Sequence, residues 1–469
     1  DEQAVEITRL NLLINSLDGK MKLPLLSSNI KCGNSLVSGT DAELKKYFGA
    51  NFRDKKPFNW EEEFPTVFAQ GGFDVVIGNP PYINSNQLGD IAGEEVKSFW
   101  RDKFQSAKRT YDIYVLFIEL SLSLCKKDGC VALITPNKYL SSPYGEALRK
   151  LIAEKYTLIS VLDLYGVKVF ENPSVYPIIT VIKAKKPLER YRFSIEKAHS
   201  ENLNGRIYNI DSDALRMMPE YVWGPILSEN IRFIEKIFKK SLPLEQVAEV
   251  QATSTAAEAD EYTTYINNEK IGVKVINTGT IDRYSTTYGK VSFKNKGKQL
   301  DEPYLDISKI SKKRSHLYTA PKIVIAKIAL RIEAFLDSGE YASINTNCVH
   351  SPKKGFTLEY LAAILNSKLF SFVYSEVFSG LKMGGGYFQF QAPQLRILPV
   401  TKVSVDAQKP LISLVNKIMA LNSKLNDGSE HSNKWEQLKS EIEKTDEKID
   451  QEVYKLYGLT DEEVKVVGS

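Results

Sequence analysis

One segment constrains the fold of this chain more than any other: residues 71–83 read Gly-Gly-Phe-Asp-Val-Val-Ile-Gly-Asn-Pro-Pro-Tyr-Ile. The apolar, β-branched run at residues 73–77 predicts a strand buried on both faces. The two prolines that follow have no N–H to donate and a fixed φ, so they end the strand in a rigid turn. A strand that runs directly into such a turn is typical of the ligand-binding edge of an α/β sheet.

Three further β-rich runs predict that the first part of the chain is an α/β domain. They are near-continuous apolar stretches at residues 131–134, 159–164 and 178–182. Parallel strands with helices on both faces have this composition. A helix is expected from about Asp112 to Cys125, between the first two strands. The alternation predicts a parallel sheet covered by helices over residues 1–187.

The character of the sequence changes after Pro187, where short β-like runs lie among polar loops. We expect residues 188–222 to form a connection and residues 223–400 to form a second, α+β domain. The expected strands of this domain lie at residues 270–276, 290–293 and 322–328, and its helices at residues 231–238 and 358–374.

The last part, residues 401–469, is predicted to be a helical hairpin. Two stretches with apolar residues on one helical face are separated by a polar break at residues 427–430. Gly458 is expected to end the second helix, and Thr460 with Glu463 to form a capping box that begins a last short helix.

Composition excludes several classes of protein. The 62 Lys+Arg against 58 Asp+Glu give a net charge of +4, so any surface for nucleic acid must come from local clusters. The four cysteines contain no Cys-x-x-Cys pair and the four histidines lie far from them, so neither a zinc site nor a disulfide framework is indicated. Residues 114–125, the most apolar stretch, are too few to cross a bilayer. We therefore expect a reduced, cytoplasmic protein without a metal.

The turn at Asn79, Pro80, Pro81 and Tyr82 carries a specific chemistry. The lone pair of an exocyclic amine on a base is delocalised into the ring, so an enzyme that methylates it must accept hydrogen bonds from its N–H groups. The Asn79 side-chain oxygen and the Pro80 carbonyl supply two such acceptors one residue apart. Tyr82 offers an aromatic face for an extruded base. A proline-rich turn without function is the alternative interpretation.

With the strand before it, this tetrapeptide resembles the amino-methyltransferases that use S-adenosyl-L-methionine, specifically the adenine-N6 methyltransferase part of type IIG restriction-modification enzymes and their phage-defence relatives. The resemblance covers nearly the whole chain. It implies an incomplete Rossmann-like methyltransferase domain, followed by an α+β DNA target-recognition domain and a helical tail. It also implies that the substrate is a flipped adenine, that the partner is double-stranded DNA, and that the four residues of the turn are catalytic.

The resemblance also implies residues for the cofactor and the target base. Residues 29–36 resemble the family's segment that contacts the cofactor's adenine, and residues 110–114 resemble the segment that follows the catalytic turn. The resemblance implies that Asn34, Ser35, Asn79 and Tyr111 bind the cofactor, although the family more often has Asp at the position of Asn34. Tyr111 and Asp112 could equally begin and cap a helix. Phe170 stands where the family has a second contact with the base, with Tyr176 as the nearby alternative. Phe170 could instead be ordinary core.

The family's glycine-rich cofactor loop has no match in this chain. Residues 1–17 read as a helix without an initiator Met or a leader, so we expect a fragment of a longer protein. The loop, the acidic residue for the ribose hydroxyls and any nuclease would lie upstream. Asp1 and Glu2 fall at or just after that acidic residue. We therefore expect this fragment to bind the cofactor poorly or not at all, and to be inactive alone.

The second half resembles the target-recognition domain of this group at residues 274–284, 360–368 and 395–399. Basic side chains suited to DNA phosphates precede and follow these stretches. They are Lys294, Lys296, Lys298, Lys312, Lys313, Arg314 and Lys382. Residues 384–389, Gly-Gly-Gly-Tyr-Phe-Gln, permit close approach of the backbone. About half of such lysines are expected to form only a solvated face.

Two other functions remain open. Asn-Pro-Pro-Tyr also occurs in methyltransferases that modify a glutamine amide of a protein, but these lack a long C-terminal recognition domain. The missing cofactor loop favours a non-catalytic DNA-specificity module. The recognition sequence and the oligomeric state do not follow from the sequence.

Overall fold

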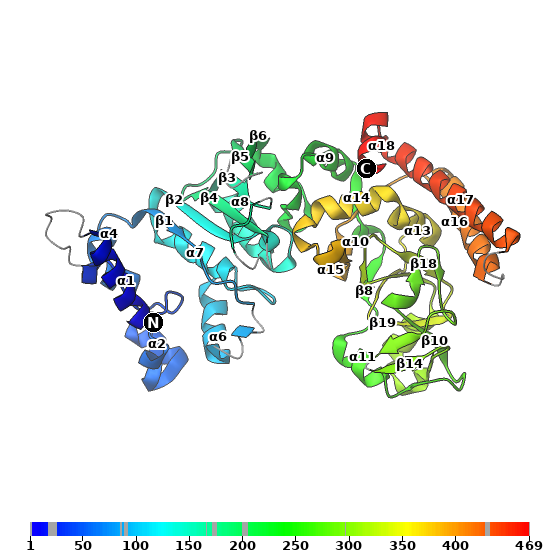
Figure 1. Ribbon diagram of the computed structural model, residues 1–469, viewed down its shortest axis with the longest axis horizontal. Helices are drawn as coiled ribbons and strands as arrows, with labels where there is room; N and C mark the ends of the chain where they lie inside the picture. Colours follow the sequence, from blue (N-terminus) through cyan, green and yellow to red (C-terminus); the bar gives the residue numbers. More distant parts are fainter. Residues whose placement is uncertain are drawn as a thin grey trace. The chain divides into compact units, whose positions relative to one another are not determined.

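The computed structural model describes residues 2–16, 26–84, 87–88, 92–165, 167–170, 176–198, 205–295, 297–426 and 432–468. The chain divides into two compact units, Asp1–Arg216 and Met217–Ser469 (Figure 1). None of the helices in these described stretches combines the length and the apolar character needed to cross a membrane.

Unit 1 is built on a sheet with the strand order β1-β2-β4-β3-β5-β6. The strands are β1 (Phe73–Gly78), β2 (Cys125–Pro136), β3 (Thr157–Asp163), β4 (Pro177–Lys183), β5 (Arg192–Ala198) and β6 (Gly205–Asp211). The predicted α/β class is confirmed, and each of the four predicted strands of this part is observed.

The expectation of an all-parallel sheet is wrong. β1 and β2 are parallel, as are β3 and β5. However, β4 runs antiparallel to both β2 and β3, between which it lies. β3 and β4 are joined by only 13 residues that contain no helix in their described part. Without a crossover helix in its described part, this connection returns β4 beside β3 in the antiparallel direction.

The predicted connection at residues 188–222 contributes two strands of this sheet. β5 and β6 form an antiparallel pair along its outer edge. Phe193 and Ile195 are buried while the neighbouring Arg192 is exposed, which is the alternation of a strand covered on one face. Unit 1 therefore extends beyond the predicted limit at residue 187.

Helices position the strands on which the turn depends. α7 (Tyr114–Leu124), the predicted helix, packs against β1 and β2, and α8 (Glu146–Lys155) packs against β3. Gly72 lies before β1 with φ +118°, and a Cβ at this position would come within 2.5 Å of the Leu124 carbonyl oxygen. Only glycine permits this close approach, which fixes the start of β1 against the end of α7. Residues 2–16 form α1 (Glu2–Ser16).

Unit 2 contains two four-stranded sheets, ordered β19-β10-β15-β9 and β18-β16-β20-β8. Their strands are β8 (Glu249–Ala252), β9 (Ile266–Asn267), β10 (Val273–Asn277), β15 (Tyr304–Leu305), β16 (Lys322–Ile325), β18 (Ala334–Asp337), β19 (Tyr341–Ile344) and β20 (Asn347–His350). The single helix expected at residues 358–374 is divided into α13 (Leu358–Asn366) and α14 (Lys368–Val377). Ser367 separates them because its hydroxyl accepts from the Phe370 N–H and caps α14.

The C-terminal tail forms α16 (Val405–Asn426), α17 (Asn433–Tyr457) and α18 (Asp461–Gly468), and α16 packs along α17. Gly458 has the left-handed φ of +64° that ends α17. The capping box is confirmed, because the Thr460 N–H donates to Glu463 and the Glu463 N–H donates to the Thr460 hydroxyl. Apolar residues of the tail join the core of unit 2, among them Leu411, Val415, Ile449 and Val453.

Candidate functional site

The Asn-Pro-Pro-Tyr turn follows β1 directly. Because β1 and β2 are parallel and Gly78 lies opposite Leu133, the two strands end at the same edge of the sheet. Asn79 and Pro81 are exposed there, whereas Pro80 is buried. The arrangement leaves the Asn79 side chain accessible while Pro80 anchors the turn against the protein.

Tyr82 is fixed by one hydrogen bond and two aromatic contacts. Its hydroxyl donates to the Ile134 carbonyl at 3.2 Å, which joins the turn to the end of β2. Its ring meets the rings of Tyr114 and Phe170 edge-on, with a centroid distance of 6.2 Å in each case. Burial raises the pKa of Tyr82, so the hydroxyl remains a donor at neutral pH.

The two residues predicted for the second contact with a base lie in different surroundings. Phe170 is half-buried and touches Tyr82. Tyr176 instead packs against Tyr165 at a centroid distance of 4.7 Å, and its carbonyl accepts from the Asn137 N–H at 2.9 Å. The side-chain oxygen of Asn137 is buried and has no hydrogen-bond partner among the described residues. Of the two predicted residues, Phe170 is the one that shares an aromatic cluster with the turn.

A buried polar network behind the turn was not predicted. The Tyr144 hydroxyl donates to the Asp112 carboxylate at 2.8 Å and lies 2.7 Å from the Tyr114 hydroxyl. Asp112 also forms an isolated β-bridge with Asn84, two residues beyond the turn. Burial raises the pKa of the Asp112 carboxyl and that of both tyrosines. The network therefore connects the segment just before α8, the helix α7 and the segment after Tyr82.

The helix-cap alternative for Asp112 is not observed, because α7 begins at Tyr114 and no side chain caps it. The feature that identifies this network is the burial of several hydroxyl groups around one carboxylate. This feature is invisible in the sequence because Asp112 and Tyr144 are 32 residues apart.

A hollow of about 230 Å³ adjoins the turn and brings Asn79 together with Ser35. Its other walls come from β1, β2, α7 and Trp60, and they are mainly apolar; Phe117 and Leu120 are among them. The Trp60 indole N–H donates to the Ser35 carbonyl at 3.3 Å and orders this wall. None of the described residues that line the hollow is acidic.

The other two residues predicted for the cofactor do not line this hollow. Asn34 lies beside Ser35, and its side-chain oxygen accepts from the Leu36 N–H at 3.2 Å. Tyr111 is 5% exposed, and burial raises the pKa of its hydroxyl. Ser35 and Asn79 are thus the two predicted cofactor residues that the fold brings to one place.

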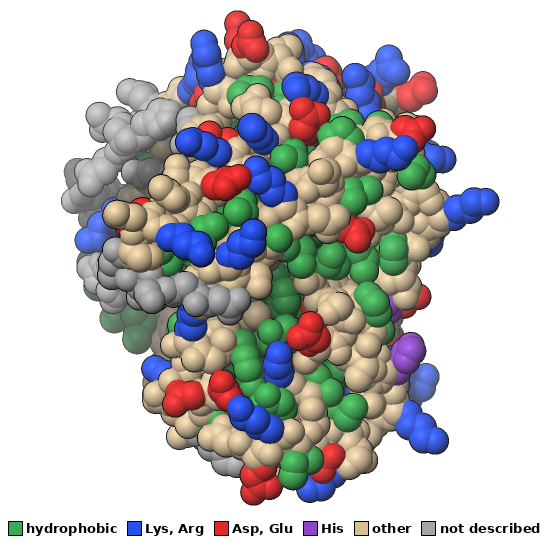
Figure 2. Space-filling view, turned by 90° about the vertical axis from the view of Figure 1, so that its right-hand side faces the viewer, with side chains coloured by type: hydrophobic (Ala, Val, Ile, Leu, Met, Phe, Trp, Pro, Cys, Tyr) green, Lys and Arg blue, Asp and Glu red, His purple; other side chains and the backbone are tan. Residues whose placement is uncertain are grey.

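Charged side chains of both signs are interspersed on the face shown in Figure 2, in agreement with the small net charge. Lys294, Lys312, Lys313 and Lys382 are exposed in unit 2. The Lys382 ammonium lies 5.9 Å from the centre of the Phe388 ring. Lys296 and the side chain of Lys298 lie outside the described residues.

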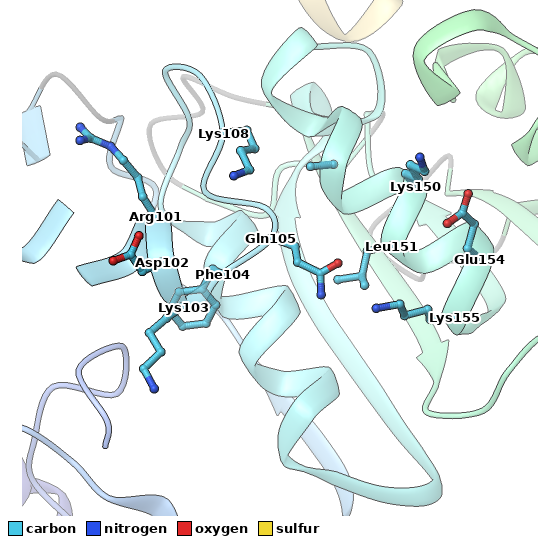
Figure 3. A pocket seen from close by; sticks show the side chains of 11 residues that line it. Arg101, Asp102, Lys103, Phe104, Gln105, Lys108, Lys150, Leu151, Glu154 and Lys155 are labelled. Carbon is cyan, nitrogen blue, oxygen red and sulfur yellow. The ribbon is translucent and has the colours of Figure 1, made fainter. Parts of the chain in front are cut away.

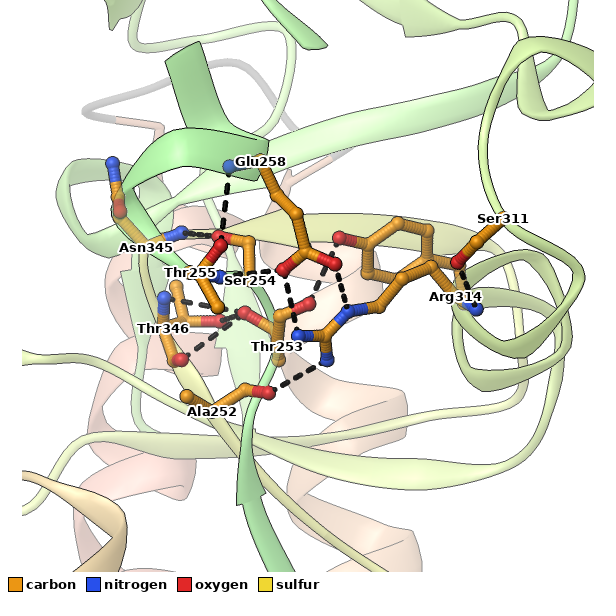
Figure 4. Close-up of polar contacts among 10 residues, drawn as sticks. Ala252, Thr253, Ser254, Thr255, Glu258, Ser311, Arg314, Asn345 and Thr346 are labelled. Atoms are coloured by element: carbon orange, nitrogen blue, oxygen red, sulfur yellow. Dashed lines mark hydrogen bonds and ion pairs between the residues drawn. The ribbon is translucent and has the colours of Figure 1, made fainter. Parts of the chain in front are cut away.

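Arg314 differs from these exposed lysines because its side chain is largely buried in an ion pair, and its predicted role in binding phosphate stays a prediction. Its guanidinium donates to both carboxylate oxygens of Glu258, at 2.9 and 2.7 Å, and to the Ala252 carbonyl at 2.9 Å. Glu258 also accepts from the Thr255 N–H in the capping box that begins α11 (Ala256–Tyr262) (Figure 4). With 13% of the Arg314 side chain exposed, the pair holds α11 and β8 to α12 (Lys312–Thr319).

Two regions of the chain match known protein families. Residues 1–170 match the family described as Eco57I restriction-modification methylase. Residues 273–400 match the family described as TaqI-like C-terminal specificity domain. The first region contains the Asn-Pro-Pro-Tyr turn and the second contains Lys294, Lys312 and Lys382.

Individual relatives come from the same group. The chain is 30% identical over 186 residues to the "Type II restriction enzyme and methyltransferase RM.Eco57I" of Escherichia coli, an alignment that covers 38% of this chain and 17% of that protein. It is 26% identical over 403 residues to the "Putative type II restriction enzyme and methyltransferase RM.MjaORFECS2P" of Methanocaldococcus jannaschii, covering 80% of this chain and 31% of that protein. The chain therefore spans less than a third of the length of either relative.

Among solved structures, the type IIL restriction-modification enzyme MmeI in complex with DNA aligns with a TM-score of 0.47 and 12% identity. The alignment covers 87% of this chain and 60% of that chain.

Proposed function

Because this chain joins a restriction-modification methylase domain of the Eco57I type to a TaqI-like specificity domain, we propose that it is part of an enzyme that methylates the N6 atom of adenine at specific sites in duplex DNA. The observation that carries the proposal is the turn itself. Asn79 is exposed at the ligand edge of the sheet, and Tyr82 beside it is fixed in an aromatic cluster with Tyr114 and Phe170.

The proposed reaction begins with an adenine extruded from the duplex. The Asn79 side-chain oxygen and the Pro80 carbonyl accept hydrogen bonds from the two N6 protons, which directs the nitrogen lone pair out of the ring. Tyr82 and Phe170 hold the faces or edge of the base. The turn would thus hold N6 toward the methyl group that the cofactor would supply, and one N6 proton would pass to water.

S-adenosylmethionine would supply the methyl group as a sulfonium, which leaves as a neutral thioether. The hollow at Ser35 and Asn79 is suited to the flat aromatic faces of the cofactor's adenine, with Trp60 and Phe117 among its walls. We propose that Asn34 supports this site through Ser35 and that Tyr111 acts only through packing, since neither lines the hollow. The acidic group for the ribose hydroxyls is not among the lining residues.

The phosphates of the DNA are proposed to meet exposed lysines of unit 2, namely Lys294, Lys312, Lys313 and Lys382. They carry no sequence information by themselves, so they would set the position of the duplex. The match to a specificity domain over residues 273–400 supports duplex DNA as the partner over the glutamine amide of a protein.

The test is methyl transfer from labelled S-adenosylmethionine to duplex DNA by the longest natural form of the protein. We expect Asn79→Ala to abolish transfer and Asn51→Ala, an exposed asparagine on a 3-10 segment, to leave it unchanged. Mass spectrometry of the digested DNA identifies the product. Product N4-methylcytosine, or undiminished transfer by the Asn79→Ala variant, would contradict the proposal.

A further inference from the structure

Unit 1 has a second hollow, which shares no lining residue with the one at Ser35 and Asn79. It has a volume of about 410 Å³ and lies between the end of α6 (Glu94–Lys103), the loop that follows it, and α8 (Figure 3). Five cationic side chains and two carboxylates line it. The cationic residues are Arg101, Lys103, Lys108, Lys150 and Lys155. This excess of positive charge is local, because the whole chain is nearly balanced.

Two of these cations are already matched inside the protein. Arg101 pairs with Glu94, and Lys103 pairs with Glu43. Of the two carboxylates, Asp102 accepts from the Tyr47 hydroxyl at 2.7 Å. The ion pairs neutralise the two cations on the α6 side, so the positive charge of the hollow comes from the other side.

The remaining three cations are Lys108 on the loop and Lys150 and Lys155 on α8. Each is exposed, and within the described residues none of the three forms an ion pair. In Figure 3 the side chains of Gln105 and Lys155 point toward each other across the hollow. Three ammonium groups outnumber the one carboxylate, Glu154, that α8 contributes to this hollow, so an anion bound among them would lower the free energy of this arrangement.

We infer that this hollow binds a phosphate group, held by Lys108 and Lys155 with the Gln105 amide as a further donor. An ammonium is a compact donor of three hydrogen bonds and suits a phosphate as a point charge. The hollow is larger than one phosphate, so the phosphate would enter with the nucleotide that carries it.

The phosphodiester backbone of DNA is the source that the structure favours, and this part of the inference rests on the proposed function. The segment that bears Lys108 is held at both ends. The Gln105 and Ser106 N–H groups donate to Glu119 of α7, at 2.9 and 2.8 Å, and Asp112 bridges to Asn84 beyond the turn. A phosphate held at Lys108 would therefore be connected through a rigid path to the site at Asn79.

The first experiment measures the salt dependence of binding between the full chain and a fluorescent duplex, by anisotropy. The variant Lys108→Gln/Lys155→Gln is compared with Lys127→Gln/Lys186→Gln, two exposed lysines near the start of β2 and the end of β4. We expect the first variant to reduce the slope of log K against log salt by up to about 2, since each phosphate that a lysine no longer neutralises lowers the slope by about 0.9. The control should keep the slope. An unchanged slope in the first variant would overturn the DNA backbone as the source.

The second experiment distinguishes free phosphate from DNA. Inorganic phosphate and adenosine monophosphate are titrated into the chain, and amide shifts of Gln105 and Lys108 are followed by nuclear magnetic resonance. Saturable shifts that the double variant abolishes, without any effect on DNA binding, would support a free nucleotide as the ligand. If neither DNA nor phosphate responds to the double variant, the phosphate site is refuted. If the native chain binds no DNA but retains the phosphate shifts, the failure lies with the proposed function instead.

Discussion

The Tyr144 hydroxyl donates a hydrogen bond of 2.8 Å to the Asp112 carboxylate, in a part of unit 1 where both side chains are largely buried. Asp112 forms the bridge to Asn84, just beyond Tyr82. The carboxylate is therefore held by a hydroxyl from a distant segment, and the bridge to Asn84 connects this pair to the chain just after the Asn-Pro-Pro-Tyr turn.

Replacing Tyr144 by Phe should destabilise the fold by about 1–3 kcal/mol, because the Asp112 carboxylate loses a donor in a buried position. Tyr139→Phe is the matched control, since it removes a hydroxyl from a neutral bond to Thr180, and it should cost only about 1 kcal/mol. Urea unfolding measures both. Equal costs for the two variants would mean that the charge of Asp112 contributes nothing.

The Asp112–Tyr144 pair also makes the stability of the fold depend on pH. Burial raises the folded pKa of Asp112 above its unfolded value, so the carboxyl favours the folded state most when it is protonated, below the unfolded pKa. This contribution is lost as the pH rises through the folded pKa. The Tyr144→Phe variant should therefore lose more stability at pH 7 than at pH 4, as measured by urea unfolding at both pH values. A penalty independent of pH would contradict this account of Asp112.

Substitutions of Phe170 and Tyr176 test which of the two residues contacts the extruded base. Phe170 touches Tyr82, whereas Tyr176 packs on Tyr165. In a duplex with 2-aminopurine at the target position, Phe170→Ala should reduce the fluorescence of the extruded base, in line with about 1–3 kcal/mol for one stacked contact. Tyr176→Ala should have a smaller effect. The reverse order would assign the contact to Tyr176.

A structural feature of this protein can be predicted from the sequence when neighbouring residues indicate it. β1 and β2 follow from the apolar runs at residues 73–77 and 131–134, and Gly458 and Thr460 follow from helix-end rules. The direction of β4 does not follow from its own sequence, because it depends on which strand the chain returns beside. β5 and β6 were missed because one face of each is polar, so neither contains a continuous apolar run.

The same distinction between local and distant sequence signals applies to the candidate site. Asn79, Pro80 and Tyr82 are contiguous, so their chemistry can be inferred from the sequence. The partner of Arg314, in contrast, is Glu258, 56 residues earlier. A Lys-Lys-Arg run is expected to face solvent or phosphate unless a distant carboxylate is known, and no local pattern indicates Glu258.

The Glu258–Arg314 pair predicts an acid sensitivity of unit 2. The Arg314 guanidinium lowers the pKa of Glu258 to about 2 from an ordinary value of 4.5. The pair therefore contributes stability fully above about pH 4.5, and this contribution is lost as the pH falls toward 2. Thermal unfolding should show that Glu258→Gln destabilises the chain most above about pH 4.5 and progressively less as the pH falls toward 2. Glu261→Gln, on the same helix, is the control and should show no such convergence.

Substitutions of Arg314 and of its neighbours Lys312 and Lys313 should have different effects on DNA binding and on stability, although the three residues are consecutive in the sequence. Lys312 and Lys313 are exposed, whereas the Arg314 guanidinium is occupied by Glu258 and the Ala252 carbonyl. Lys312→Gln/Lys313→Gln should reduce the salt slope of binding by up to about 2 and leave the melting temperature unchanged. Arg314→Gln should lower the melting temperature and leave the salt slope unchanged, because it breaks a largely buried pair and leaves Lys312 and Lys313 in place. Anisotropy titrations at several salt concentrations and thermal unfolding measure the two effects. If Arg314→Gln lowered the slope while the melting temperature stayed constant, Arg314 would leave Glu258 to meet DNA, and its assignment as a structural residue would be wrong.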